Sequence, residues 1–231
     1  MTQGSREEYR AELLSRVPRR YSPLLHVLLP ALVGLVMVAW ALAQVDDPEP
    51  LELALLPVFF LVGNALEWHA HRGLLHRRTR FLEVLYVRHT PQHHHLYVAG
   101  DFAIRSLREL RFVLLPGYAV LLIVAFASPF ALVALALGEV NVAALWLASA
   151  VTYVLAYEWL HLAAHLPPES PIGRLRLVRA LRRHHELHHA PHLMNRWNFN
   201  VTLPVWDFVR GTAYHRPGPA PADVALARRA R

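Results

Sequence analysis

Four long apolar runs interrupt this chain and restrict its possible folds more than any other feature of the sequence. They span residues 24–45, 51–68, 112–137 and 142–160. The first run is 22 residues long, and as an α-helix it would extend roughly 33 Å, enough to cross the hydrocarbon core of a bilayer. Buried helices of a soluble protein keep a polar face, which these runs lack. We therefore predict about four membrane-spanning helices.

The third run contains two prolines, Pro116 and Pro129. A proline inside a helix removes one backbone hydrogen bond and kinks or ends the helix. The sequence therefore leaves two structures open for residues 112–137: one kinked, tilted helix, or a helix together with a re-entrant turn.

The arginines predict the orientation of these helices. All 24 basic residues are arginines: five precede the first run, eight lie between the second and third, and eleven follow the fourth. The two remaining loops contain acidic residues and no arginine. By the positive-inside rule, both termini and the 69–111 segment face the cytoplasm, and we expect a multi-pass protein of a bacterial inner membrane. Arginines spread between apolar runs do not form a nucleic-acid-binding patch.

The same pattern divides the chain into three parts. Residues 1–23 form a cytoplasmic basic N-terminal segment, and residues 24–212 form the membrane domain. Residues 213–231 are rich in proline and arginine, which is typical of a disordered tail. The chain contains no cysteine, which excludes thiolate metal sites, iron–sulfur clusters and disulfides.

Histidines gather in the predicted cytoplasmic segments. Of 16 histidines, 15 lie beyond residue 68, and most fall in four clusters with the patterns HxxxxH, HxxxHH, HxxxH and HxxHH. Imidazole is a good ligand for iron, zinc, copper and nickel. The ten candidate metal ligands are His71, His76, His89, His93, His94, His161, His165, His185, His188 and His189.

Spacing indicates which of these histidines act together. His161 and His165 share one helix face, and so do the three histidines of residues 185–189. On an ideal α-helix His71 and His76 diverge by about 140°, so they need a helix end or two ions to bridge. Ten imidazoles exceed the needs of one ion, which favours two. Four further histidines are more typical of groups that orient ligands or face solvent: His69, His95, His184 and His192.

Taken together, these segments resemble the fatty acid hydroxylase / sterol desaturase superfamily. Residues 67–76, EWHAHRGLLH, and residues 157–165, YEWLHLAAH, are similar to its first and third histidine motifs. HELHH at 185–189 matches its HxxHH motif, and NVTLPVWDFVRGT at 200–212 resembles its closing segment. The second cluster departs from the commonest form, because HTPQHH has one residue more than HxxHH. Since Pro91 disfavours a regular helix there, either His93 and His94 or His94 and His95 could be the ligand pair.

The resemblance implies an all-α polytopic membrane bundle of about four transmembrane helices, with a cytoplasmic histidine-rich helical cap that holds a dimetal site. The metal would be a pair of iron ions, with zinc possible in purified protein, and O2 the co-substrate. The implied enzyme is an oxidoreductase of lipid biosynthesis that hydroxylates a C–H bond of a membrane lipid, most simply a fatty acyl chain. No catalytic side chain beyond the ligands is indicated, and no oligomeric state follows from the sequence.

Alternatives within and outside this superfamily remain open from the sequence. A sterol or carotenoid desaturase or hydroxylase has the same motifs, although the closing segment favours an acyl lipid. A membrane metal transporter would need polar ligands near the middle of the spans, where Asn64 is the only strongly polar residue. No haem-binding domain is fused to the chain, so we expect a separate electron-transfer protein, such as a ferredoxin, to dock on the basic face.

Overall fold

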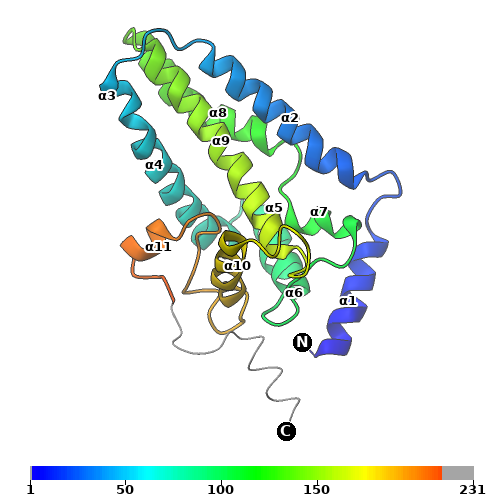
Figure 1. Ribbon diagram of the computed structural model, residues 1–231. Helices are drawn as coiled ribbons and strands as arrows, with labels where there is room; N and C mark the ends of the chain where they lie inside the picture. Colours follow the sequence, from blue (N-terminus) through cyan, green and yellow to red (C-terminus); the bar gives the residue numbers. More distant parts are fainter. Residues whose placement is uncertain (1, 215–231) are drawn as a thin grey trace.

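The computed structural model describes residues 2–214, and within that range its regular elements are all helices, apart from one isolated β-bridge between Val98 and Asp101. Four long helices form a bundle, and short helices gather at one end of it (Figure 1). Residues 215–231, most of the predicted tail, lie outside the described part of the chain. The elements in chain order are α1 (Gln3–Ser15), α2 (Pro23–Leu42), α3 (Pro50–Leu53), α4 (Leu55–Ala70), the π-helix η1 (His71–Leu75), α5 (Glu83–Val87), the π-helix η2 (Arg88–His93), α6 (His94–Leu96), the 3-10 helix η3 (Leu107–Glu109), α7 (Leu110–Val113), α8 (Ala119–Ala136), α9 (Val140–His165), α10 (Arg176–His188) and α11 (Val205–Val209).

Four stretches of helix are long and apolar enough to cross a membrane, as the sequence predicts. They are Pro23–Leu42, Pro50–Leu75, Ala119–Ala136 and Val140–His165, with mean hydropathies of 2.3, 1.5, 2.6 and 1.6. Most of their large apolar side chains point outward, and Phe126, for example, is 68% exposed. Such a surface is stable against lipid tails and not against water.

The third apolar run resolves into one spanning helix that begins later than the apolar sequence does. Helix α7 ends at Val113, Leu114 has extended backbone angles, and α8 starts at Ala119. Pro116 accounts for this break, because a proline disfavours helix in the residue before it. The backbone N–H of Leu115 donates instead to both carboxylate oxygens of Glu158, at 3.1 Å each.

Helix α9 lies at the centre of the bundle and packs against α2, α4 and α8. Small side chains make close approach possible: Ala131 and Ala134 of α8 and Ala143 of α9 form a buried cluster. Gly63 of α4 faces Tyr153 of α9, and a Cβ atom there would stand 2.7 Å from the tyrosine ring. The chain therefore brings α4 and α9, the two spans that lead into histidine clusters, side by side.

The N-terminal segment is also structured and packs on the short helices. Arg10 of α1 forms an ion pair with Glu109, and both side chains are buried. The same guanidinium donates to the carbonyl of Leu96 at 3.1 Å, and the hydroxyl of Tyr97 donates to Glu109 at 3.2 Å. Figure 1 shows α1 at the end of the bundle where α5, α6 and α10 lie, opposite the α2–α3 and α8–α9 connections.

Candidate metal centre

Nine of the ten predicted ligands come together in two buried groups at this end of the bundle. In each group, one nitrogen from every histidine lies within 4.8 Å of one from each other member. The groups adjoin each other, since the stacked rings of His94 and His189 have centroids 4.0 Å apart. The first group is His71, His76, His89, His94 and His188, and the second is His93, His165, His185 and His189.

Two π-helical turns build the first group. Residues His71–Leu75 and Arg88–His93 are both π-helices, in which backbone hydrogen bonds join residues i and i+5. Residues five apart then lie on nearly one face, so His71 and His76 stack with ring centroids 5.1 Å apart. His89 and His94 have the same spacing, and their Nε2 atoms are 3.0 Å apart. The divergence of an ideal α-helix does not apply to His71 and His76, because the helix widens into a π-helical turn at its end.

Backbone carbonyls fix the tautomer of five of these imidazoles. The Nδ1 atoms of His93, His165, His188 and His189 lie 2.6–2.9 Å from the carbonyls of Phe112, Phe102, Trp197 and Tyr97. His71 Nδ1 contacts the carbonyl of Phe199 in the same way. A carbonyl oxygen only accepts, so Nδ1 carries the proton and Nε2 presents a lone pair to the centre of the group. This is the usual arrangement around a metal-ligating histidine.

The spacing of the Nε2 atoms fits a shared cation. The Nε2 atoms are 2.9 Å apart in His71 and His89, 3.0 Å in His76 and His188, and 3.2 Å in His185 and His189. Two nitrogens on one ion at about 2.0–2.1 Å would be roughly 2.9–3.4 Å apart. The Nε2 of His165 is buried and has no hydrogen-bond partner in the described residues. The donor set, all imidazole nitrogen, therefore fits metal ions of the kind the sequence predicts.

Burial keeps these imidazoles neutral. Removal from water lowers the pKa of His76 and of His93 to about 4. It also lowers the pKa of His185 and of His189 well below the ordinary value, with further lowering from neighbouring histidines. A neutral imidazole is the form that binds a metal ion, so the site is prepared for cations at physiological pH.

The remaining candidate histidines occupy different places. His161 lies beside the second group, with its Nε2 3.3 Å from that of His93. His69, His95 and His192 are exposed to solvent and lie outside both groups. His184 contacts Asp207, with Nε2 3.1 Å from the carboxylate. The structure thus brings His93 and His94, and not His95, into the buried cluster.

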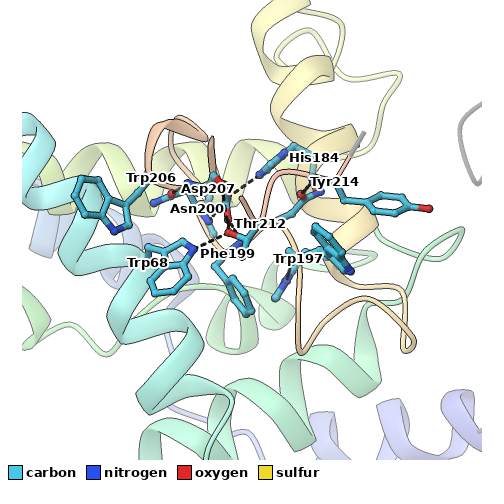
Figure 2. A network of polar contacts seen from close by, with 12 residues as sticks. Trp68, His184, Trp197, Phe199, Asn200, Trp206, Asp207, Thr212 and Tyr214 are labelled. Carbon is cyan, nitrogen blue, oxygen red and sulfur yellow. Dashed lines mark hydrogen bonds and ion pairs between the residues drawn. The ribbon is translucent and has the colours of Figure 1, made fainter. Parts of the chain in front are cut away.

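The closing segment supports the neighbouring residue Phe199, whose carbonyl orients His71, and Asp207 is at the centre of this contact (Figure 2). The fully buried Asp207 carboxylate accepts hydrogen bonds from the backbone N–H groups of Phe199 and Asn200, at 3.0 and 2.8 Å. It also accepts from the hydroxyl of Thr212, at 2.7 Å. These bonds fix the turn from which the Phe199 carbonyl reaches His71. The motif in residues 200–212 therefore acts as a support for the ligands.

A second polar network joins the closing segment to the spans, and the sequence did not predict this contact. Glu67 accepts hydrogen bonds from Tyr153 and from the backbone and hydroxyl of Thr202. The side-chain amide of Asn64 donates to the carbonyl of Leu203 at 2.8 Å and accepts from the backbone of Trp206 at 2.8 Å. The sequence signal for this network is the presence of polar residues within apolar spans. Asn64 is therefore a structural contact between α4 and the closing segment.

An all-helical membrane bundle with two adjoining groups of buried imidazoles at one end is a protein built to hold metal next to lipid. Residues 56–212 match the sequence profile of the fatty acid hydroxylase family. The match covers more than half of the sequence, and the chain belongs to the fatty acid hydroxylase family.

One solved structure shows a similar fold. It is that of full-length scs7p, in which only the hydroxylase domain is visible. The TM-score is 0.55 at 22% sequence identity, and the likeness covers 86% of this chain and 69% of that one. No curated protein sequence matches this chain significantly. The family and the shared fold support a metal-dependent lipid hydroxylase.

Proposed function

We propose that this protein is a membrane-bound di-iron oxygenase that inserts one oxygen atom from O2 into a C–H bond of a membrane lipid, on an acyl chain. One observation carries the proposal. Two adjoining groups of neutral, buried imidazoles, with lone pairs directed inward, lie at the end of four apolar helices. Family membership supports the reaction class.

The proposed ligands are the nine grouped histidines together with His161, which lies beside the second group. When bound there, a pair of iron ions supplies the activation of O2 that an unactivated C–H bond requires. The protein holds the imidazoles in one tautomer and excludes water around them. Zinc competes for such ligands because it binds them more tightly than ferrous iron does.

A lipid can approach this centre through the bundle. A cavity of about 350 Å³ lies among α2, α4 and α9, and its walls are mostly apolar, with Val38, Leu56, Phe60 and Leu160 among them. Tyr153 and Thr202 also line it, and both contact Glu67, one helical turn before His71. The apolar lining suits an acyl chain, and its contacts with Glu67 support an approach to the histidine-rich end.

We propose that a separate electron-transfer protein supplies the electrons, and α10 offers a place for it to dock. Helix α10 carries His185 and His188 on its buried face, and its exposed residues include Arg176, Arg179 and Arg183. An acidic carrier such as a ferredoxin would be attracted to this face, close to the metal site. We place this face, with both termini, on the cytoplasmic side of a bacterial inner membrane.

The deciding experiment is expression in a host with a defined lipidome, under labelled O2 and with an electron donor present, followed by mass spectrometry of extracted lipids. A lipid that gains one labelled oxygen supports hydroxylation, and its identity separates acyl lipid from sterol or carotenoid. A lipid that loses two hydrogens without gaining oxygen makes the protein a desaturase. An unchanged lipidome would count against the enzyme and in favour of a metal transporter.

Matched variants tie the activity to the centre. His188→Ala and His161→Ala should abolish the product while membrane insertion is unchanged. His192→Ala removes an exposed imidazole outside both groups, so its activity should equal that of the wild type.

A further inference from the structure

A second, smaller cavity adjoins the histidines. Its volume is about 40 Å³, room for a few water-sized groups. His89, His93 and His161 line it, together with apolar side chains that include Leu85, Val113 and Tyr157. Two arginines line the same cavity, Arg88 and Arg111. One small space therefore connects two guanidinium groups with three of the proposed ligands.

These arginines have no acidic partner. Elsewhere in the described chain Arg10, Arg78 and Arg105 each form an ion pair with a carboxylate. No such pair involves Arg88 or Arg111 within residues 2–214. Glu158 is the nearest acid to influence Arg88, and both of its oxygens already accept from the backbone of Leu115.

The positive charge is also held in place and partly removed from water. The Arg88 side chain donates to the carbonyls of Arg111 and Leu114, at 3.0 and 3.4 Å, which fixes its position beside the cavity. Both arginines are half-buried. Two neighbouring cations that are partly desolvated and unpaired are unfavourable unless an anion joins them.

We infer that Arg88 and Arg111 bind the anionic head group, a carboxylate or a phosphate, of the lipid that the histidine centre oxidises. This inference rests on the proposed function and names the class of its substrate. Guanidinium groups bind both anions through paired hydrogen bonds. Arg88 begins η2, and Arg111 lies in α7, the last helix before spanning helix α8, so a head group bound between them would sit near the membrane surface. A head group fixed there holds one end of the chain at a set distance from the metal ligands, and so selects the carbon that reacts.

The test measures binding without turnover. Metal-loaded protein in a neutral detergent, without O2 or an electron donor, is titrated with hexadecanoate, hexadecyl phosphate and uncharged hexadecanol. Both anions should bind roughly tenfold more tightly than the alcohol, as expected for charge-assisted hydrogen bonds. Arg111→Gln should remove this preference. Arg77→Gln, which removes an exposed arginine of the same end of the bundle, should keep it.

Each result has one interpretation. Equal binding of the three amphiphiles, or an equal loss of preference in both variants, would overturn the head-group site. If inorganic phosphate alone binds as tightly as hexadecyl phosphate, the arginines take a free anion and the lipid assignment is wrong. If Arg111→Gln does not fold, the wild-type preference must still shrink as salt is raised, because salt screens partly exposed charges. If the wild type prefers the anionic amphiphiles but oxidises no lipid, the proposed reaction is wrong and the head-group site still stands.

Discussion

At the scale of single residues, the direction of each imidazole lone pair matters more than the number of histidines. His188 belongs to the first group and His165 to the second, and each has its Nδ1 proton committed to a carbonyl. Each is therefore a fixed Nε2 donor that water cannot easily replace.

We expect purified protein to contain about two metal ions per chain, because two ligand groups are present. His188→Ala and His165→Ala should each reduce the content to about one, since each removes a donor from a different group. Elemental analysis measures this, with His192→Ala as the control. A wild-type content of zero or one tightly bound ion would contradict the two-ion site.

The metal-free fold should lose stability as pH falls from about 6.5 to about 4. Burial lowers the pKa of His76 and His93 to about 4, whereas the ordinary value is 6.5. Between these values the unfolded chain binds more protons than the fold does, so acid favours unfolding; above about 6.5 the effect vanishes. Thermal unfolding of chelator-treated protein across this range measures it. A midpoint that rises on acidification would show that these imidazoles are protonated in the fold.

The residues of the site are only partly predictable from sequence. Positions i and i+4 lie on one face of any regular helix, so the proximity of His161 and His165 follows from spacing, and their rings are 4.9 Å apart. That His93 and His94 enter different groups does not follow, because it depends on the π-helical turn that Pro91 occupies. Supporting residues such as Tyr153 carry no spacing signal, since their partners are more than 40 positions away.

At the scale of elements, the closing segment gives the site its rigidity. Its turn is held by Asp207, and no member of residues 200–212 belongs to either histidine group. The motif is readable in the sequence, but its role is not, because the Asp207 side chain acts on His71 only indirectly, through the backbone of Phe199.

Asp207→Ala should therefore lower metal content without removing a ligand. The change leaves the buried N–H groups of Phe199 and Asn200 without their acceptor, at about 1–3 kcal/mol each. We expect a lower thermal midpoint and a loss of metal that is greatest in the first group, through His71. Glu169→Ala, which removes an exposed carboxylate, is the control. Full metal content in Asp207→Ala would show that the turn does not orient the ligands.

At the scale of the whole molecule, the bundle separates two chemical surfaces. The acidic α2–α3 and α8–α9 connections lie at one end, and the arginine- and histidine-rich elements lie at the other. Apolar runs predict the four spans well, because lipid requires them. They do not predict where the third begins, since Pro116 and Glu158 decide that by local bonding.

A cysteine placed at Glu139 should react with a membrane-impermeant reagent from outside the cell, and one placed at Arg80 should not. Both positions are exposed, at opposite ends of the bundle, and the chain has no cysteine of its own. The positive-inside rule sets the expected direction. Labelling at Arg80 in intact cells would show that the protein has the opposite orientation. As a control, both cysteines should be labelled after the membrane is permeabilised.

The division of the histidines along the chain has a consequence for biogenesis. In the first group, His188 is synthesised after the fourth span, whereas the other members are synthesised before the third. In the second group, His93 is synthesised before the third span, whereas the other members lie at the end of the fourth span or after it. Neither group can form on a nascent chain until α10 has left the ribosome and all four spans are inserted. The insertion machinery therefore handles a chain without metal at these sites, and a metal ion can be bound only by a finished fold that shields it.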